Sequence, residues 1–257
     1  MSALNGIRGI LFDLDGVFFV GNQMIPGADA LIAQLKQKRV PCRYLTNTTT
    51  HTRAEIASKL QGMGLPILAD EIISTPSAAL SYLRHQAYRT CHLLVADSVK
   101  QEFEGFPTDD INPDVVVIGD IGDAWNYQLL NKVFLMLKKG AHLIALHKNK
   151  FWQTEDGLRM DIGAFVTGLE YVTDIQAVVI GKPSQAFFQM AVEQLNLPAS
   201  EVLMVGDDID ADVGGAQRAG FKAALVRTGK YREEYAASSR VRPDWIFDSV
   251  AALTQLI

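Results

Sequence analysis

Two groups of aspartates follow apolar runs that predict buried strands. Asp13 and Asp15, with Gly16 behind them, come directly after the run 7–12. Two carboxylates two residues apart can converge on one cation while one oxygen attacks a substrate or moves a proton. An acidic turn at a strand end has the same pattern, so this pair decides nothing by itself.

The second group is denser and more informative. Asp207, Asp208, Asp210 and Asp212 lie within six residues, after the apolar run 202–205. Carboxylates this close repel one another unless a cation or a helix N-terminus compensates them. The Gly and distal Glu of a helix-loop-helix calcium site are missing. The pattern therefore favours a metal of another kind.

Two further polar groups follow predicted strands. Thr46 and Asn47 could donate hydrogen bonds to an anion, although the threonines behind them could equally cap the next helix. Lys182 precedes Pro183, which can open a helix, and an isolated lysine of this kind is usually solvated. All four groups fall at strand ends, where open α/β sheets bind their ligands.

Short apolar or β-branched runs alternate with stretches of helical period. Strands are predicted over 7–12, 43–45, 178–180, 202–205 and 223–226, and helices over 28–38, 53–63, 184–195 and 212–219. This alternation predicts a parallel sheet with helices on its faces. The middle of the chain has predicted strands over 92–96, 115–118 and 143–146 and a helix over 125–139. It is either more of the same sheet or an inserted domain.

Composition limits the class of protein. The 257 residues carry a net charge of −5 and are 48% hydrophobic, which is typical of a globular protein and generous for one domain. The acidic balance predicts no nucleic-acid partner. We expect Cys42 and Cys91 to be buried reduced thiols. Without a leader or an apolar run of about 18 residues, we expect a cytoplasmic protein with no membrane partner.

In their order along the chain, Asp-x-Asp-Gly, Thr-Asn, Lys-Pro and Gly-Asp-Asp-x-x-x-Asp resemble the four motifs of the haloacid dehalogenase (HAD) superfamily of phosphohydrolases. The long separation of Asn47 from Lys182 resembles the NagD-like class IIA, which carries an αβ cap between the second and third motifs. Runs such as 165–171 and 228–231 resemble its branch with haloacid dehalogenase-like hydrolase domain-containing protein 2 and phospholysine phosphohistidine inorganic pyrophosphate phosphatase.

The resemblance implies an α/β fold, with a doubly wound Rossmann-like parallel sheet core and an inserted αβ cap domain. The expected core is 1–77 with 180–257, and the expected cap, which would select the substrate, is 78–179. The cap would also pair two copies as a homodimer. In the cap, a polar-aromatic stretch suits a substrate loop, although solvation and packing explain it equally well; it comprises His147, Lys148, Asn149, Phe151 and Trp152.

The resemblance also implies Mg²⁺-dependent hydrolysis of small phosphorylated metabolites through an aspartyl phosphate. The implied roles are Asp13 as nucleophile, Asp15 as acid and base, Asp13, Asp207 and the Asp15 carbonyl as metal ligands, Thr46, Asn47 and Lys182 as phosphate ligands, and Asp208 and Asp212 as groups that orient metal waters and Lys182. The main alternative is a catalytically silent HAD scaffold that binds a ligand or another protein. A phosphorelay receiver, which would be about half this length, a dehalogenase and a mutase are further alternatives.

Overall fold

A computed structural model describes residues 4–154 and 157–257, which divide into two compact units. The first unit contains the described residues up to Thr46 together with Arg53–Ile73 and Lys182–Ile257. The second contains Asn47–Thr52 and Ser74–Gly181. Within the described part of the chain, no helix combines the length and the apolar character that crossing a membrane requires.

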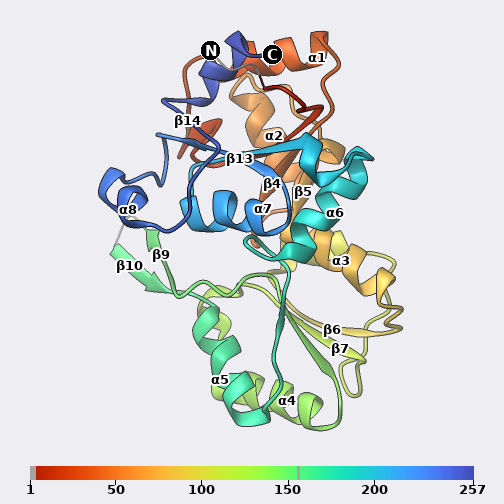
Figure 1. The fold of residues 1–257 in the computed structure, drawn as a ribbon. Helices are drawn as coiled ribbons and strands as arrows, with labels where there is room; N and C mark the ends of the chain where they lie inside the picture. The colour runs from red at the N-terminus through yellow and green to blue at the C-terminus, as the bar shows by residue number, and fades with distance from the viewer. Residues whose placement is uncertain (1–3, 155–156) are drawn as a thin grey trace. The chain divides into compact units, whose positions relative to one another are not determined.

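A six-stranded sheet forms the centre of the first unit (Figure 1). Its strands, in spatial order, are β14 (Trp245–Phe247), β13 (Lys222–Val226), β12 (Val202–Gly206), β1 (Gly9–Asp13), β4 (Cys42–Thr46) and β5 (Ile72–Ser74). The pairs from β14 through to β4 are parallel. All five residues of β1 and of β12 are buried, as expected for strands covered on both faces. The doubly wound α/β core is therefore confirmed.

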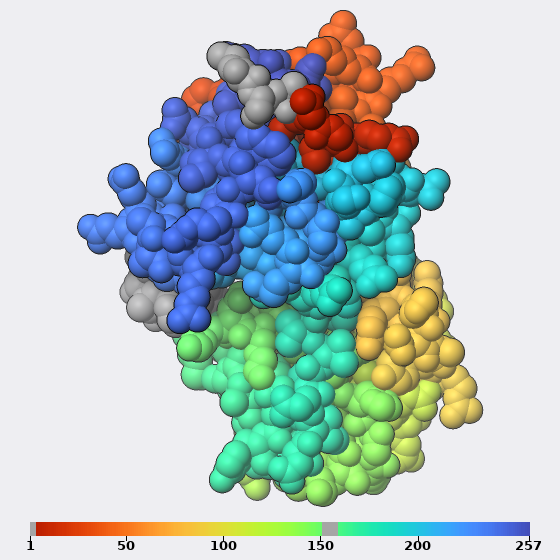
Figure 2. All heavy atoms as spheres, viewed as in Figure 1, coloured from red at the N-terminus to blue at the C-terminus, as the bar shows by residue number. Residues whose placement is uncertain are grey.

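The helices of this unit include α1 (Ala28–Gln37), α2 (Arg53–Gly62), α6 (Gln185–Leu195) and the short α7 (Gly215–Arg218), each of which buries residues, and α8 (Glu233–Ser238), which buries none. Apolar residues of α1 and α2 join alternate residues of β1, β12 and β13 in one core cluster. In that cluster the rings of Phe12, Phe18 and Tyr44 contact one another, with centroids 5.2 to 5.9 Å apart. Figure 2 shows N-terminal segments in red and orange beside C-terminal segments in blue within this unit.

The second unit contains its own sheet of four parallel strands, in the order β11 (Val178–Val179), β8 (His142–Ala145), β7 (Val115–Ile118) and β6 (Cys91–Leu94). The middle of the chain is thus a separate sheet. Its helices include α3 (Thr75–His85), α4 (Tyr127–Lys138) and α5 (Gly163–Thr173). An antiparallel hairpin joins β9 (Phe151–Thr154) to β10 (Gly157–Met160). The side chains of Phe151 and Trp152, predicted for a substrate loop, lie outside the described ones.

One predicted strand belongs to a different sheet. The alternation of strands and helices groups the run 178–180 with the core strands, whereas the expected cap, 78–179, contains both residues of β11. In the structure β11 pairs with β8 in the second unit, with Val178 opposite Ile144 and Val179 opposite Ala145. An apolar run has the same composition in either sheet. Only the pairing partner distinguishes them.

Candidate active site

The site lies where the order of the core sheet reverses. From β1 the chain goes first to β4 on one side, and after the second unit it continues with β12 on the other. Asp13 is the last residue of β1, and Asp207 directly follows β12. Crevices at the carboxyl ends of strands at such a switch point are the usual ligand sites of open α/β sheets.

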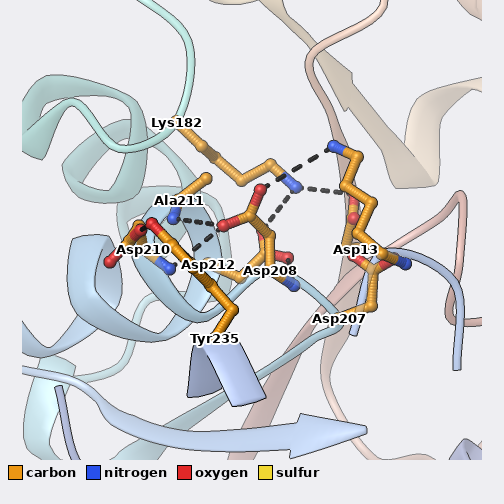
Figure 3. A network of polar contacts seen from close by, with 9 residues as sticks. Asp13, Lys182, Asp207, Asp208, Asp210, Ala211, Asp212 and Tyr235 are labelled. Carbon is orange, nitrogen blue, oxygen red and sulfur yellow. Dashed lines mark hydrogen bonds and ion pairs between the residues drawn. The ribbon is translucent and has the colours of Figure 1, made fainter. Parts of the chain in front are cut away.

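A buried lysine joins two of the aspartates (Figure 3). Lys182 Nζ lies 2.6 Å from Asp13 Oδ1 and 2.7 Å from Asp212 Oδ1. All three side chains are almost fully buried. Gly215 lets α7 approach the residue behind this lysine, since a Cβ there would lie 3.0 Å from Pro183 Cα. The lysine is therefore fixed between the carboxylates and is not the solvated residue that its sequence context alone suggests.

Three carboxylates converge beside this lysine. Asp13, Asp207 and Asp212 each offer an oxygen within 4.8 Å of the others. Burial, followed by the negative charges of Asp13 and Asp212, raises the pKa of Asp207 to about 8. Burial and Asp13 also raise the pKa of Asp212, to about 6, against the opposing effect of Lys182. Burial would lower the pKa of Lys182, but Asp13 and Asp212 outweigh it and raise that pKa. The site has more negative charge than its lysine can balance.

The two oxygens of Asp207 differ in their contacts. Oδ2 accepts a hydrogen bond from the Lys230 amide at 2.7 Å. Oδ1 is buried and has no hydrogen-bond partner among the residues that the structure describes. A buried carboxylate oxygen without a partner is costly unless something else binds it. Together with the neighbouring carboxylates, it is the kind of hard oxygen ligand that Mg²⁺ prefers. The residues present therefore fit a divalent cation.

Asp208 and Asp212 contact different groups. Asp208 caps a π-helical turn over Ile209–Gly214, where its Oδ1 accepts hydrogen bonds from the amides of Asp210 and Ala211 at 3.0 and 2.9 Å. Its other oxygen lies 3.9 Å from the exposed ammonium of Lys230. Asp212 instead reaches Lys182 directly and accepts a hydrogen bond from the Asp208 amide. This cap accounts for part of the acidic run as local structure.

The remaining predicted residues are divided between the two units. Asp15 is exposed, yet partial desolvation by the surrounding atoms, followed by the negative charge of Asp13, raises its pKa. Thr46 is buried at the end of β4, one residue beyond the pair formed by Asp13 and Leu45. Asn47 belongs to the second unit, where a Cβ on Gly181 would lie 2.8 Å from its Oδ1. Asp13, Lys182, Asp207 and Asp212 are thus brought into one cluster within the first unit.

Sequence reasoning assigned no role to the turn Thr228–Lys230, which contacts Asp207. The Lys230 amide bonds the Asp207 carboxylate, and the Thr228 hydroxyl donates to the carbonyl oxygen of Gly16. The available signal was the position of this Thr-Gly pair, two residues after the apolar run of β13. The turn follows β13, so it lies at the same edge of the core sheet as the polar groups that follow β1, β4 and β12.

A doubly wound parallel sheet with clustered carboxylates and a buried lysine at its switch point is the arrangement expected of a hydrolase of the haloacid dehalogenase type. The family model described as haloacid dehalogenase-like hydrolase matches residues 10–107. The model described as HAD-hydrolase-like matches residues 179–253. The first match contains Asp13, and the second contains Lys182, Asp207 and Asp212.

Relatives match nearly the whole chain. Phospholysine phosphohistidine inorganic pyrophosphate phosphatase of Homo sapiens is 38% identical over 260 residues, covering 99% of this chain and 95% of the relative. Haloacid dehalogenase-like hydrolase domain-containing protein 2 of Homo sapiens is 39% identical over 232 residues, covering 90% of this chain and 88% of the relative. The chain therefore belongs to the haloacid dehalogenase superfamily and is a phosphatase of its NagD-like class.

Solved structures agree with this assignment. The 4-nitrophenylphosphatase of Thermotoga maritima superimposes with a TM-score of 0.91 at 26% identity and covers 99% of both chains. NagD of Escherichia coli K-12 superimposes with a TM-score of 0.87 at 26% identity, covering 95% of this chain and 97% of NagD. The family and class predicted from the four motifs are confirmed.

Proposed function

We propose that this phosphatase hydrolyses small phosphorylated metabolites in a Mg²⁺-dependent reaction, with Asp13 as the nucleophile. The observation that carries the proposal is the position of the Asp13 carboxylate. It stands at the switch point of the sheet, 2.6 Å from a buried ammonium and beside an unpartnered oxygen of Asp207. A site of this kind can neutralise a phosphoryl group and attack it with the same set of residues.

The proposed reaction has two displacements. A carboxylate oxygen of Asp13 forms a bond to phosphorus while the bond from phosphorus to the leaving oxygen breaks, and that oxygen takes a proton from Asp15. Water then attacks phosphorus and gives its proton to Asp15. The bond between Asp13 and phosphorus breaks, which releases inorganic phosphate and restores the carboxylate. The raised pKa of Asp15 suits it to carry this proton between the two steps.

In this proposal, the carboxylates of Asp13 and Asp207 and the backbone carbonyl of Asp15 hold Mg²⁺. The ion supplies positive charge that lets an anionic nucleophile approach an anionic phosphate. Lys182 adds a second positive charge and holds the Asp13 carboxylate in place through their ion pair. Thr46 and Asn47 would donate hydrogen bonds to phosphate oxygens, and Asp212 would hold Lys182 in its position.

The test compares Asp13→Asn with the wild-type protein in hydrolysis of p-nitrophenyl phosphate, with Mg²⁺ and with EDTA. We expect Mg²⁺-dependent turnover by the wild type and its loss in the variant, with an unchanged circular dichroism spectrum. Asp97→Asn is a matched control, because Asp97 is exposed in the second unit and pairs with Lys100. Full activity of Asp13→Asn would refute the nucleophile. A wild type without turnover would favour the silent scaffold.

We also propose that residues 1–77 and 180–257 act as the catalytic core and that residues 78–179 act as a cap that selects the substrate. Relatives are named for pyrophosphate, phospholysine, phosphohistidine and 4-nitrophenyl phosphate. The candidate substrates are therefore small phosphomonoesters, pyrophosphate and phosphoamidates. A screen of phosphorylated metabolites tests this proposal, and it fails if none is hydrolysed faster than p-nitrophenyl phosphate.

We further propose a homodimer formed through the cap. Helices α4 and α5 border an apolar groove of about 410 Å³, lined by residues that include Leu130, Phe134, Phe165 and Val172. Val172 is 50% exposed, and apolar faces of this kind are typical of interfaces. Light scattering should give the mass of a dimer for the wild type and of a monomer for Val172→Glu. A monomeric wild type would contradict the proposal.

A further inference from the structure

The Asp207 carboxylate lies between two glycines that have no room for a side chain. Gly16 and Gly229 both adopt left-handed conformations, with φ of +85° and +58°. A Cβ on Gly16 would lie 1.8 Å from Asp207 Oδ2, and a Cβ on Gly229 would lie 2.1 Å from the same oxygen. The Gly229 Cβ would also lie 2.4 Å from Gly16 Cα. These distances are far inside van der Waals contact, so a side chain at either glycine would overlap the Asp207 carboxylate.

Hydrogen bonds hold the same parts together. The Lys230 amide donates to Asp207 Oδ2 at 2.7 Å, so the oxygen that touches both glycines is also bonded to the turn. The Thr228 hydroxyl donates to the Gly16 carbonyl and ties the turn to the segment that follows β1. Steric contact and hydrogen bonds thus fix Oδ2, while Oδ1 stays buried and unpartnered among the described residues.

We propose that the turn Thr228–Lys230, closed against Gly16, positions the Asp207 carboxylate so that its Oδ1 is held ready for the metal. Gly229 and Thr228 are positioning residues, because neither binds the ion or the substrate in this proposal: Gly229 contacts Asp207, and Thr228 holds the turn against Gly16. The inference rests on the proposed Mg²⁺-dependent function and adds a determinant of metal affinity to it. A carboxylate that could rotate would satisfy Oδ1 with another donor and would have to give up that bond before binding the ion.

The test compares Gly229→Ala with Gly21→Ala. Gly21 has nearly the same backbone conformation, with φ of +60°, but a Cβ there would meet nothing within 4 Å. The two variants therefore share the strain of alanine in the left-handed region and differ in the clash with Asp207. Two readouts are measured: the Mg²⁺ concentration that gives half of the thermal stabilisation without substrate, and the one that gives half-maximal hydrolysis of p-nitrophenyl phosphate.

We expect Gly229→Ala to raise both Mg²⁺ concentrations about 10- to 100-fold, the usual range when a residue that orients a metal ligand is changed. Gly21→Ala should stay within about twofold of the wild type, since it leaves those contacts intact. At saturating Mg²⁺ the KM of Gly229→Ala should match the wild type, and most of kcat should return. A purely structural defect would lower the melting temperature with and without the ion and would leave both Mg²⁺ midpoints at their wild-type values.

A second pair of variants covers the case in which Gly229→Ala fails to fold, judged by near-ultraviolet circular dichroism. Thr228→Val removes the hydroxyl that bonds Gly16 and should raise the Mg²⁺ requirement, whereas Thr228→Ser keeps it and should not. Wild-type Mg²⁺ affinity in folded Gly229→Ala, or in Thr228→Val if the first variant is unfolded, overturns the positioning role alone. A wild type whose stability and activity ignore Mg²⁺ overturns the proposed function and this inference together.

Discussion

Replacing Lys182 by Met should destabilise the protein by an amount that depends strongly on pH. Methionine has a similar length but no charge, so the change leaves Asp13 and Asp212 buried without the ammonium that lies 2.6 and 2.7 Å from them. Removing one partner of a buried ion pair typically costs about 3–5 kcal/mol, because the remaining charge is uncompensated. We expect a loss of this size in the free energy of unfolding at pH 8 without metal.

At pH 5 the loss should fall below about half of that value, because the carboxyls can take up protons instead. The pKa of Asp212 is already raised to about 6 with Lys182 present, and removing the lysine raises it further. The folded variant therefore binds protons more tightly than the unfolded chain does. Relative to the wild type, it gains stability as the pH falls from 8 to 5. Saturating Mg²⁺ should have a similar effect, since the ion supplies positive charge.

The assay is urea unfolding in EDTA at pH 5 and pH 8, followed by circular dichroism. Lys230→Met is the matched control, because the Lys230 side chain is 70% exposed and its ammonium lies 3.9 Å from Asp208. It should change the free energy of unfolding by less than about 1 kcal/mol at either pH. An equal loss at both pH values for Lys182→Met would show that packing rather than charge controls the site, and would refute the reasoning.

Three further outcomes follow from the same contacts. Burial and neighbouring charges raise the pKa of Asp207 to about 8, so its carboxyl in the folded protein keeps a proton that the unfolded chain loses. The stability of the wild type in EDTA should therefore fall as the pH rises from about 4 to 8. Asn cannot lose this proton, so the melting temperature of Asp207→Asn relative to that of the wild type should rise between pH 5 and pH 8.5; a difference that stays constant with pH would contradict this. Asp15→Asn should lower kcat by about 10²- to 10⁴-fold. Its Mg²⁺ affinity, measured by calorimetry, should not change, because the backbone carbonyl remains. A wild-type kcat would exclude Asp15 as the residue that carries the proton. Asn126→Ala removes the side-chain oxygen that accepts from the Leu129 amide at 2.9 Å at the start of α4, so chemical denaturation should show a loss of about 1 kcal/mol without a change in kcat; an unaltered midpoint would argue against the cap.

Much of the core could be predicted because its strands are continuous apolar runs. The predicted run 202–205 became β12, and 223–226 became β13 with one more residue at its start. The side chains that follow these strands could be singled out for the same reason, since the ends of parallel strands meet at one edge of the sheet. Residue type, spacing and strand position singled out Asp13 and Asp207, whereas Lys182 was added only because the order of the four motifs resembles that of the family.

The rest depends on tertiary contacts that have no local pattern. The partner of β11 cannot be read from a two-residue apolar strand. Gly16 and Gly229 differ from the other left-handed glycines because the Asp207 carboxylate occupies the space where their Cβ atoms would be. The burial of Lys182 likewise depends on Asp13, which lies 169 positions earlier in the chain. Contacts over such separations are properties of the folded sheet and leave no trace in residue spacing.

The central position of β1 also has a consequence for the order in which the protein can be built. Its neighbour β12 begins at Val202, whereas all four strands of the second sheet are complete by Val179. On the ribosome, the second sheet can form first, while β1 still has one edge without a partner. Closing a loop of this length carries an entropic cost that the strand pairing must offset. Asp13 is therefore synthesised before the second unit, yet Lys182, Asp207 and Asp212 can join it only after that unit has been synthesised.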